Sequence, residues 1–139
     1  MAEFIKVTEQ SSLYDNLEQM SVTDLLTNLN NEDQKVALAV RESIPVMAAL
    51  VEKIVERMEK GGRVFYIGAG TSGRLGVLDA SELPPTYGVS PDLVIGLIAG
   101  GDKALRSAVE SAEDDAHKAW NELKEFDANE LDTLIGIAA

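Results

Sequence analysis

Three short apolar runs divide the second half of the chain, and each has the length of a buried β-strand. They cover residues 64–67, 93–99 and 134–139, and glycine-containing segments lie beside them. Runs of four to eight apolar residues bounded by turn signals are typical of buried strands. Because segments with helical patterns separate them, we expect parallel strands joined by right-handed crossovers. The pattern therefore predicts an α/β fold with a partial parallel sheet of about three strands.

The first half of the chain is patterned for helices. Ser21 followed by Asp24 predicts a capped helix start, and Asn30-Asn31 predicts a break before a second helix near Glu32. Pro45 is expected to kink that helix or restart it. Beyond it, apolar residues recur at steps of three and four, which predicts a strongly amphipathic helix. These positions are Ile44, Met47, Ala48, Val51, Ile54, Val55 and Met58.

Two further helices are expected between the strands. The first follows residue 68 and should end near Ser81, because Pro84-Pro85 indicates a rigid loop. The second should begin with Asp102 as its cap and continue as one long helix. Its expected buried face is Leu105, Ala108, Val109, Ala112, Ala116, Trp120 and Leu123.

Taken together, these patterns predict three parts of the chain: a polar arm over residues 1–20, a helical segment over 21–62 and the first half of an α/β domain over 63–139.

Composition narrows the possible functions. The chain has 139 residues, 45% of them hydrophobic and 26% charged, and a net charge of −12, which argues against nucleic acids and anionic membranes as partners. It has no cysteine and one histidine, so we expect neither thiolate chemistry nor a histidine-rich metal site. The first 20 residues carry no apolar leader and no later run could span a bilayer, so a cytoplasmic location is expected.

The candidate chemistry lies directly after the first apolar run, in the glycine-rich segment 68–76. Its glycines at 68, 70, 73 and 76 allow sharp turns and a close approach of the backbone to a ligand. Thr71 contributes a hydroxyl, and Ser72 is expected to cap the following helix. Amides at a helix N-terminus form an anion site together with the helix dipole. The segment therefore predicts a phosphate cradle at the carboxyl end of the first strand.

The loop allows two other interpretations. Its spacing also fits the dinucleotide fingerprint, which requires an acidic residue about 20 positions later. The acid after the next strand is Asp102, which is too distant and has the position of a helix cap. No nucleotide cofactor is therefore expected. The plain alternative is a strand-to-helix turn without a ligand, and the combination of four glycines with two hydroxyls disfavours it.

The sequence YIGAGTSGRLGVLDASELPPTYGV, which starts at Tyr66, resembles the N-acetylmuramic acid 6-phosphate etherases. This family is a branch of the sugar isomerase (SIS) domain proteins, and the resemblance covers essentially the whole chain. Four other segments agree with it: 14–17, 31–33, 96–101 and 109–114. Vertebrate glucokinase regulatory proteins are similar to the same branch and bind sugar phosphates without catalysis, which provides a second functional hypothesis.

The resemblance implies a flavodoxin-like sheet in a homodimer that binds an amino-sugar phosphate without cofactor or metal. The implied reaction removes D-lactate from C3 of N-acetylmuramic acid 6-phosphate and leaves N-acetylglucosamine 6-phosphate. Gly70, Thr71, Ser72 and Gly73 match the phosphate-binding loop. Glu82 and Glu113 match the family's two acidic residues. The family usually has cysteine where this chain has Leu83.

The implied reaction needs a base for the proton on C2 and an acid for the departing C3 oxygen. Glu82, beside Leu83 and the proline pair, is expected to be partly desolvated and so to have a raised pKa, which suits the acid. Glu113 is a candidate base or a substrate-orienting group. From the residues alone, the favoured interpretation of Glu82 is a surface acid, and that of Glu113 is one of several acids on a solvated helix face.

The family extends beyond the third strand into a further binding loop, strands and helices that this chain does not contain. Activity of the chain alone is therefore in doubt, and a third hypothesis is an interaction module with an idle site. A flavodoxin-like order of strands, 2-1-3, would leave residues 134–139 as an open apolar edge. Together with the amphipathic helix, this edge predicts self-association into dimers or larger assemblies.

Overall fold

The computed structural model describes residues 10–109 and 118–138. The chain divides into two compact units, Met1–Ala49 and Leu50–Ala139, and each is considered by itself. The first contains the short 3-10 helix η2 (Leu17–Gln19) and the beginning of α1 (Val22–Met58). The predicted cap is confirmed, because the Asp24 amide donates to Ser21 Oγ at 3.1 Å.

Helix α1 is continuous from Val22 to Met58. The predicted break at Asn30-Asn31, the new start near Glu32 and a restart at Pro45 are therefore wrong. Asparagine costs a helix interior less than about 1 kcal/mol relative to alanine. Asn30 also gains a partner one turn later, since Gln34 Nε2 donates to its Oδ1 at 2.8 Å.

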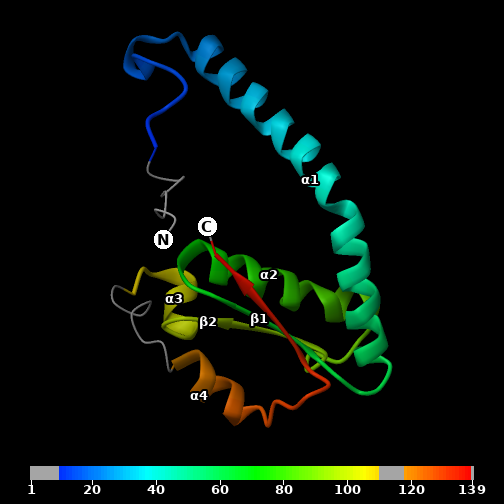
Figure 1. Cartoon of the computed structure of the whole chain (residues 1–139). Helices are drawn as coiled ribbons and strands as arrows, with labels where there is room; N and C mark the ends of the chain where they lie inside the picture. The colour runs from blue at the N-terminus through cyan, green and yellow to red at the C-terminus, as the bar shows by residue number, and fades with distance from the viewer. Residues whose placement is uncertain (1–9, 110–117, 139) are drawn as a thin grey trace, which may run out of the picture. The chain divides into compact units, whose positions relative to one another are not determined.

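The second unit contains a three-stranded parallel sheet with the order β2-β1-β3 (Figure 1). Strand β1 (Val64–Gly68) pairs with β2 (Val94–Ile98) on one side and with β3 (Thr133–Ile137) on the other. This confirms the α/β class, the three strands and their predicted order. Strand β3 alternates between half-buried and exposed residues, which fits its position at the edge of the sheet.

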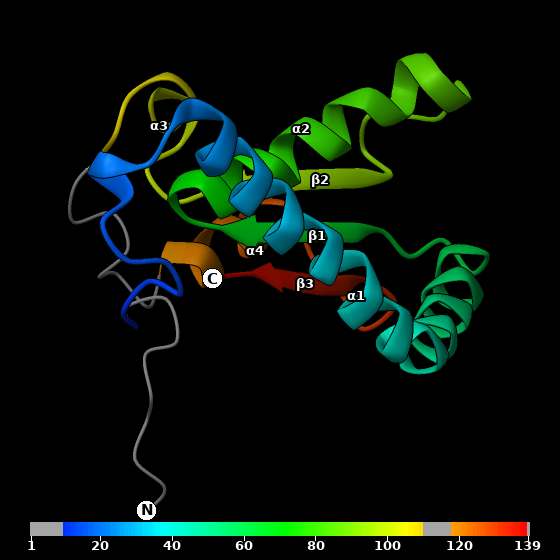
Figure 2. The ribbon, with the colours of Figure 1, turned by 90° about the horizontal axis from the view of Figure 1, so that it is seen from above.

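Helices cover both faces of this sheet. Helix α2 (Gly70–Tyr87) lies along one face and α4 (Lys118–Glu125) along the other, and Figures 1 and 2 show the two on opposite sides of β1. Phe65 is the most buried large side chain, at 1% exposed, and its ring meets that of Phe126 edge-on at 5.7 Å. Successive strand residues face opposite sides, so Tyr66 lies against α2.

Helix α2 is longer than the sequence predicts. It continues through Pro84 and Pro85 to Tyr87, so the predicted end near Ser81 and the rigid proline loop are wrong. The prolines lie in the last turn, where only the carbonyls of residues 80 and 81 lose a helical donor. The helix ends at Gly88, which has φ +67° and donates its amide to the Pro84 carbonyl at 2.8 Å.

The predicted long helix after β2 is also wrong. Helix α3 spans only Asp102–Arg106, and Ser107 after it is extended, with φ −137° and ψ 142°. A helical period cannot continue across an extended residue, so the expected buried face fails in part. Leu123 is buried as predicted, whereas Trp120 is 59% exposed, with Lys124 Nζ 5.3 Å from its ring centroid. Ala112 and Ala116 lie outside the described residues.

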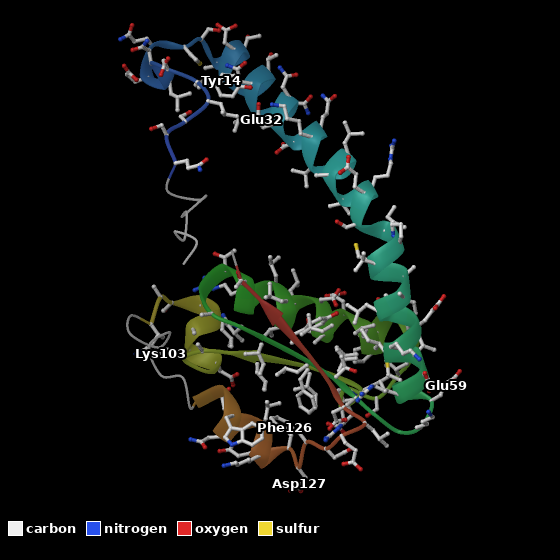
Figure 3. All side chains as sticks on the ribbon, viewed as in Figure 1. Tyr14, Glu32, Glu59, Lys103, Phe126 and Asp127 are labelled. Carbon is white, nitrogen blue, oxygen red and sulfur yellow. The ribbon has the colours of Figure 1, made fainter. Side chains whose placement is uncertain are left out.

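Side-chain contacts fasten the amino ends of β1 and β3. Asp132 is 5% exposed at its side chain and accepts from Arg63 Nη2 at 2.8 Å and from the Arg63 amide at 2.7 Å. Arg63 Nη2 also donates to the carbonyl of Phe126 at 3.0 Å, and Phe126 is labelled in Figure 3. The guanidinium holds the pKa of the Asp132 carboxyl below its usual value.

The predicted amphipathic helix exists within α1, and most of its apolar positions are exposed. Ile44, Met47, Val51 and Val55 are between 47% and 54% exposed, whereas Ile54 and Met58 are half-buried. No helix among residues 10–109 and 118–138 has the length and hydropathy needed to cross a membrane.

Candidate anion-binding site

The glycine-rich segment forms the junction between β1 and α2. Strand β1 ends at Gly68, Ala69 is extended with φ −117° and ψ 159°, and α2 begins at Gly70. Gly70 has φ +52°, a conformation that favours glycine. The segment therefore turns from strand to helix within two residues, at the carboxyl edge of the sheet where ligands of open α/β folds bind.

Two of the glycines allow the helix to pack directly on the strand. A Cβ at Gly73 would lie 2.6 Å from the Gly68 carbonyl oxygen and 2.6 Å from Ile98 Cγ1. A Cβ at Gly68 would lie 2.7 Å from the Gly73 amide nitrogen. Any side chain at either position would push α2 away from β1 and β2. The spacing that resembles a dinucleotide fingerprint is thus explained in part by packing.

Among the described residues, no side chain caps the start of α2. Its N-cap is Ala69, and the predicted cap Ser72 lies instead inside the first turn, half-buried, so that prediction is wrong. Gly73 is the first residue to donate back into the helix, to the Ala69 carbonyl at 3.0 Å. The amides of Gly70, Thr71 and Ser72 precede it and have no partner within the helix. No acidic residue lies in this first turn, so the arrangement suits an anion.

A second turn lies beside this loop, at the end of β2. The Ala99 amide donates to the Gly68 carbonyl at 3.0 Å, which joins the two carboxyl ends. Gly100 and Gly101 follow with φ +94° and +64°. Gly101, not the predicted Asp102, is the N-cap of α3, and no side chain within residues 10–109 and 118–138 caps that helix. The glycine pair is visible in the sequence, but the sequence did not indicate that Gly101 is the N-cap of α3.

Arg74 also lies in this region, and the sequence predicts no role for it. It lies in the second turn of α2, half-buried, and its Nε donates to the Leu105 carbonyl of α3 at 3.2 Å. Its position within the glycine-rich motif was visible in the sequence. Its partner was not, because the predicted long helix would already have satisfied that carbonyl.

The structure does not bring Glu82 to the glycine loop. Glu82 lies inside α2 rather than beyond it, and its side chain is exposed, so the predicted desolvation by Leu83 and the prolines is wrong for this chain. Twelve residues separate Glu82 from Gly70, which corresponds to about 18 Å along the helix axis. One small sugar bound at the loop cannot span that distance. Glu113 lies outside the described residues.

Tyr66 of β1 is a titratable group that packs against α2. Burial against α2, followed by a hydrogen bond with Asp79, raises the pKa of the Tyr66 hydroxyl. It therefore stays protonated at neutral pH and can donate. Among the residues that the structure describes, no three histidine, cysteine or acidic side chains come together as metal ligands.

The chain is similar to proteins named N-acetylmuramic acid 6-phosphate etherase. That of Bacteroides fragilis is 62% identical over 98% of this chain and 48% of its own length. That of Bacteroides thetaiotaomicron is 61% identical over 99% of this chain and 50% of its own length. That of Aliivibrio fischeri is 53% identical over 96% of this chain and 45% of its own length. The chain thus spans about half the length of the curated relatives it matches.

A family model agrees with this similarity. Residues 46–139 match the model described as the glucokinase regulatory protein N-terminal SIS domain. The matched part includes the whole sheet, the glycine loop and the turn after β2. With its partial α/β sheet and its identity to the etherases, the chain belongs to this SIS-domain family.

Proposed function

We propose that this chain is the N-terminal part of a cytoplasmic N-acetylmuramic acid 6-phosphate etherase. The reaction releases D-lactate and yields N-acetylglucosamine 6-phosphate, which would recycle a cell-wall amino sugar. The observation that carries the proposal is the uncapped start of α2 directly after β1, in a chain 62% identical to a protein of that name. This junction provides backbone donors for the phosphate group of the substrate.

In this proposal the Gly70, Thr71 and Ser72 amides and the two hydroxyls hold the phosphate, and Gly73 lets the helix approach closely. Holding one end of the substrate fixes the reacting C2 and C3 atoms in one place, which lowers the entropic part of the barrier. The open-chain aldehyde acidifies the proton on C2. A carboxylate removes it, the C3–O bond breaks, an acid protonates the departing lactate oxygen, and water then adds to the double bond.

Glu82 is the proposed acid and Glu113 the proposed base or orienting group. Because Glu82 is about 18 Å along α2 from the loop, its carboxyl cannot act on the sugar held at the start of its own helix. It would act on the sugar held by a second copy, so the proposal includes a homodimer. The remaining half of the protein and the partner copy would supply the burial that Glu82 lacks here.

The test is release of D-lactate from N-acetylmuramic acid 6-phosphate by the full-length protein, comparing the parent with Glu82→Gln. Glutamine cannot transfer the proton, so we expect turnover to fall about 10²–10⁴-fold while product binding changes little. Glu125→Gln, which changes an exposed acid of α4, is the matched control and should retain activity. Near-parental turnover by the Glu82 variant would exclude its role as the acid.

The second candidate is a regulatory module that binds sugar phosphate without catalysis. It is favoured by the description of the matching family model, which names a regulatory protein. The two hypotheses differ in one outcome. A regulatory module would bind N-acetylglucosamine 6-phosphate and release no lactate from any amount of substrate, whereas the etherase would do both.

A further inference from the structure

The turn after β2 has little local support of its own. Helix α3 contains five residues, far fewer than an isolated helix needs to be stable in water. Both glycines before it have positive φ, and a Cβ at Gly100 would lie 2.9 Å from Ala104 Cβ. Because the turn and α3 pack this closely, a displacement of α3 would move the Gly100–Gly101 backbone with it.

Arg74 connects this weak element to the glycine loop. Its side chain starts four residues after Gly70, so it is fixed to the first turns of α2. Its Nε donates to the Leu105 carbonyl, which is among the last carbonyls of α3 and has no helical donor. A hydrogen bond from a charged donor is stronger than one between neutral groups, and it restrains α3 from its carboxyl end.

We infer that Arg74 is a positioning residue that holds α3 and the Gly100–Gly101 turn in place beside the start of α2. With Arg74 in place, the Gly100–Gly101 turn stays beside the start of α2, where the Ala99 amide donates to the Gly68 carbonyl and the α2 amides would hold the anion. That this anion is a sugar phosphate rests on the proposed function. The restraint on α3 does not, since it follows from the Arg74–Leu105 contact alone.

The first experiment measures amide hydrogen exchange in the parent chain, Arg74→Met, Arg74→Lys and Arg106→Met. Arg106 is an exposed residue of α3, so its variant removes the same charge from the same region. We expect the amides of Ala104 and Ser107, which donate to Gly101 and Lys103, to exchange about tenfold faster in both Arg74 variants. The Gly73 amide and the melting temperature should change little. Parental exchange at Ala104 and Ser107 in both variants would overturn the inference.

The second experiment measures the affinity of the same proteins for N-acetylglucosamine 6-phosphate. We expect about tenfold weaker binding for Arg74→Met and Arg74→Lys, because lysine keeps the charge but lacks Nε, and a change within about twofold for Arg106→Met. Equal losses for Arg74→Met and Arg106→Met, with parental affinity in Arg74→Lys, would show a charge effect and overturn the inference. If the parent chain does not bind the sugar phosphate, the phosphate site at the start of α2 fails for this chain, and hydrogen exchange still decides the role of Arg74.

Discussion

The two ends of the sheet are constructed differently. At the amino end, side chains make the contacts: Arg63 and Asp132 form an ion pair with additional backbone bonds, and Arg57 donates to the Glu130 carbonyl. At the carboxyl end, the described contacts are mainly those of backbone and glycine, with Arg74 as the side-chain link. A fold can be stabilised at one end while the other keeps its backbone donors available for a ligand.

The largest effect should come from adding one methyl group at the carboxyl end. Gly73→Ala places a Cβ 2.6 Å from the Gly68 carbonyl oxygen, a rigid backbone atom. We expect the free energy of unfolding to fall by about 2–4 kcal/mol, measured by urea denaturation, and anion binding to be lost with it. Gly136→Ala is the control, since nothing lies within 4 Å of the added Cβ. Equal stability of the two variants would contradict the close packing of α2 on β1.

A smaller effect is expected at the amino end. Asp132→Asn removes the charge that pairs with Arg63 and should lower the free energy of unfolding by about 2–3 kcal/mol, while anion binding is kept. Glu130→Gln is the control, because that side chain is exposed and its carbonyl, which accepts from Arg57, is unchanged. Loss of anion binding in Asp132→Asn, with the fold intact, would show that the two ends are not independent.

The same pair predicts a pH dependence. The pKa of Asp132 is lowered on folding from its ordinary value of 3.8, so the ion pair contributes fully above that value. The contribution should be lost as the pH falls from about 3.8 through the lowered pKa. The slope of unfolding free energy against pH in this acid range should therefore be smaller in Asp132→Asn than in the parent chain.

The sheet could be predicted from the sequence because its signals are local. Continuous apolar runs determine the strands and indicate that they are parallel. The order β2-β1-β3 was expected instead from the flavodoxin-like sheet that the family resemblance implies. The predicted helix bounds were wrong where the surrounding structure outweighed a local signal such as a proline pair or a helical period. Pro84 and Pro85 are tolerated because they lie in the last turn of α2, and Trp120 is exposed because the extended Ser107 interrupts the helical period.

The candidate site was predictable in position and not in detail. The glycine spacing located the loop, but packing of Gly73 on Gly68 cannot be distinguished from ligand binding without coordinates. The distance from Glu82 to the loop depends on the length of α2. The proline pair predicted a helix end near Ser81, whereas α2 continues to Tyr87. The contact of Arg74 with Leu105 could not be foreseen, because it requires α3 to end where it does.

The central claim is that the start of α2 binds the phosphate of an amino sugar. The most direct measurement is a titration of the ¹⁵N-labelled chain with N-acetylglucosamine 6-phosphate, following the backbone amide resonances. We predict saturable shifts at Gly70, Thr71 and Ser72, which have no helical partner, and little change at Val64 and Thr133 at the opposite end of the sheet. Saturable binding that leaves the three loop amides unmoved would contradict the account.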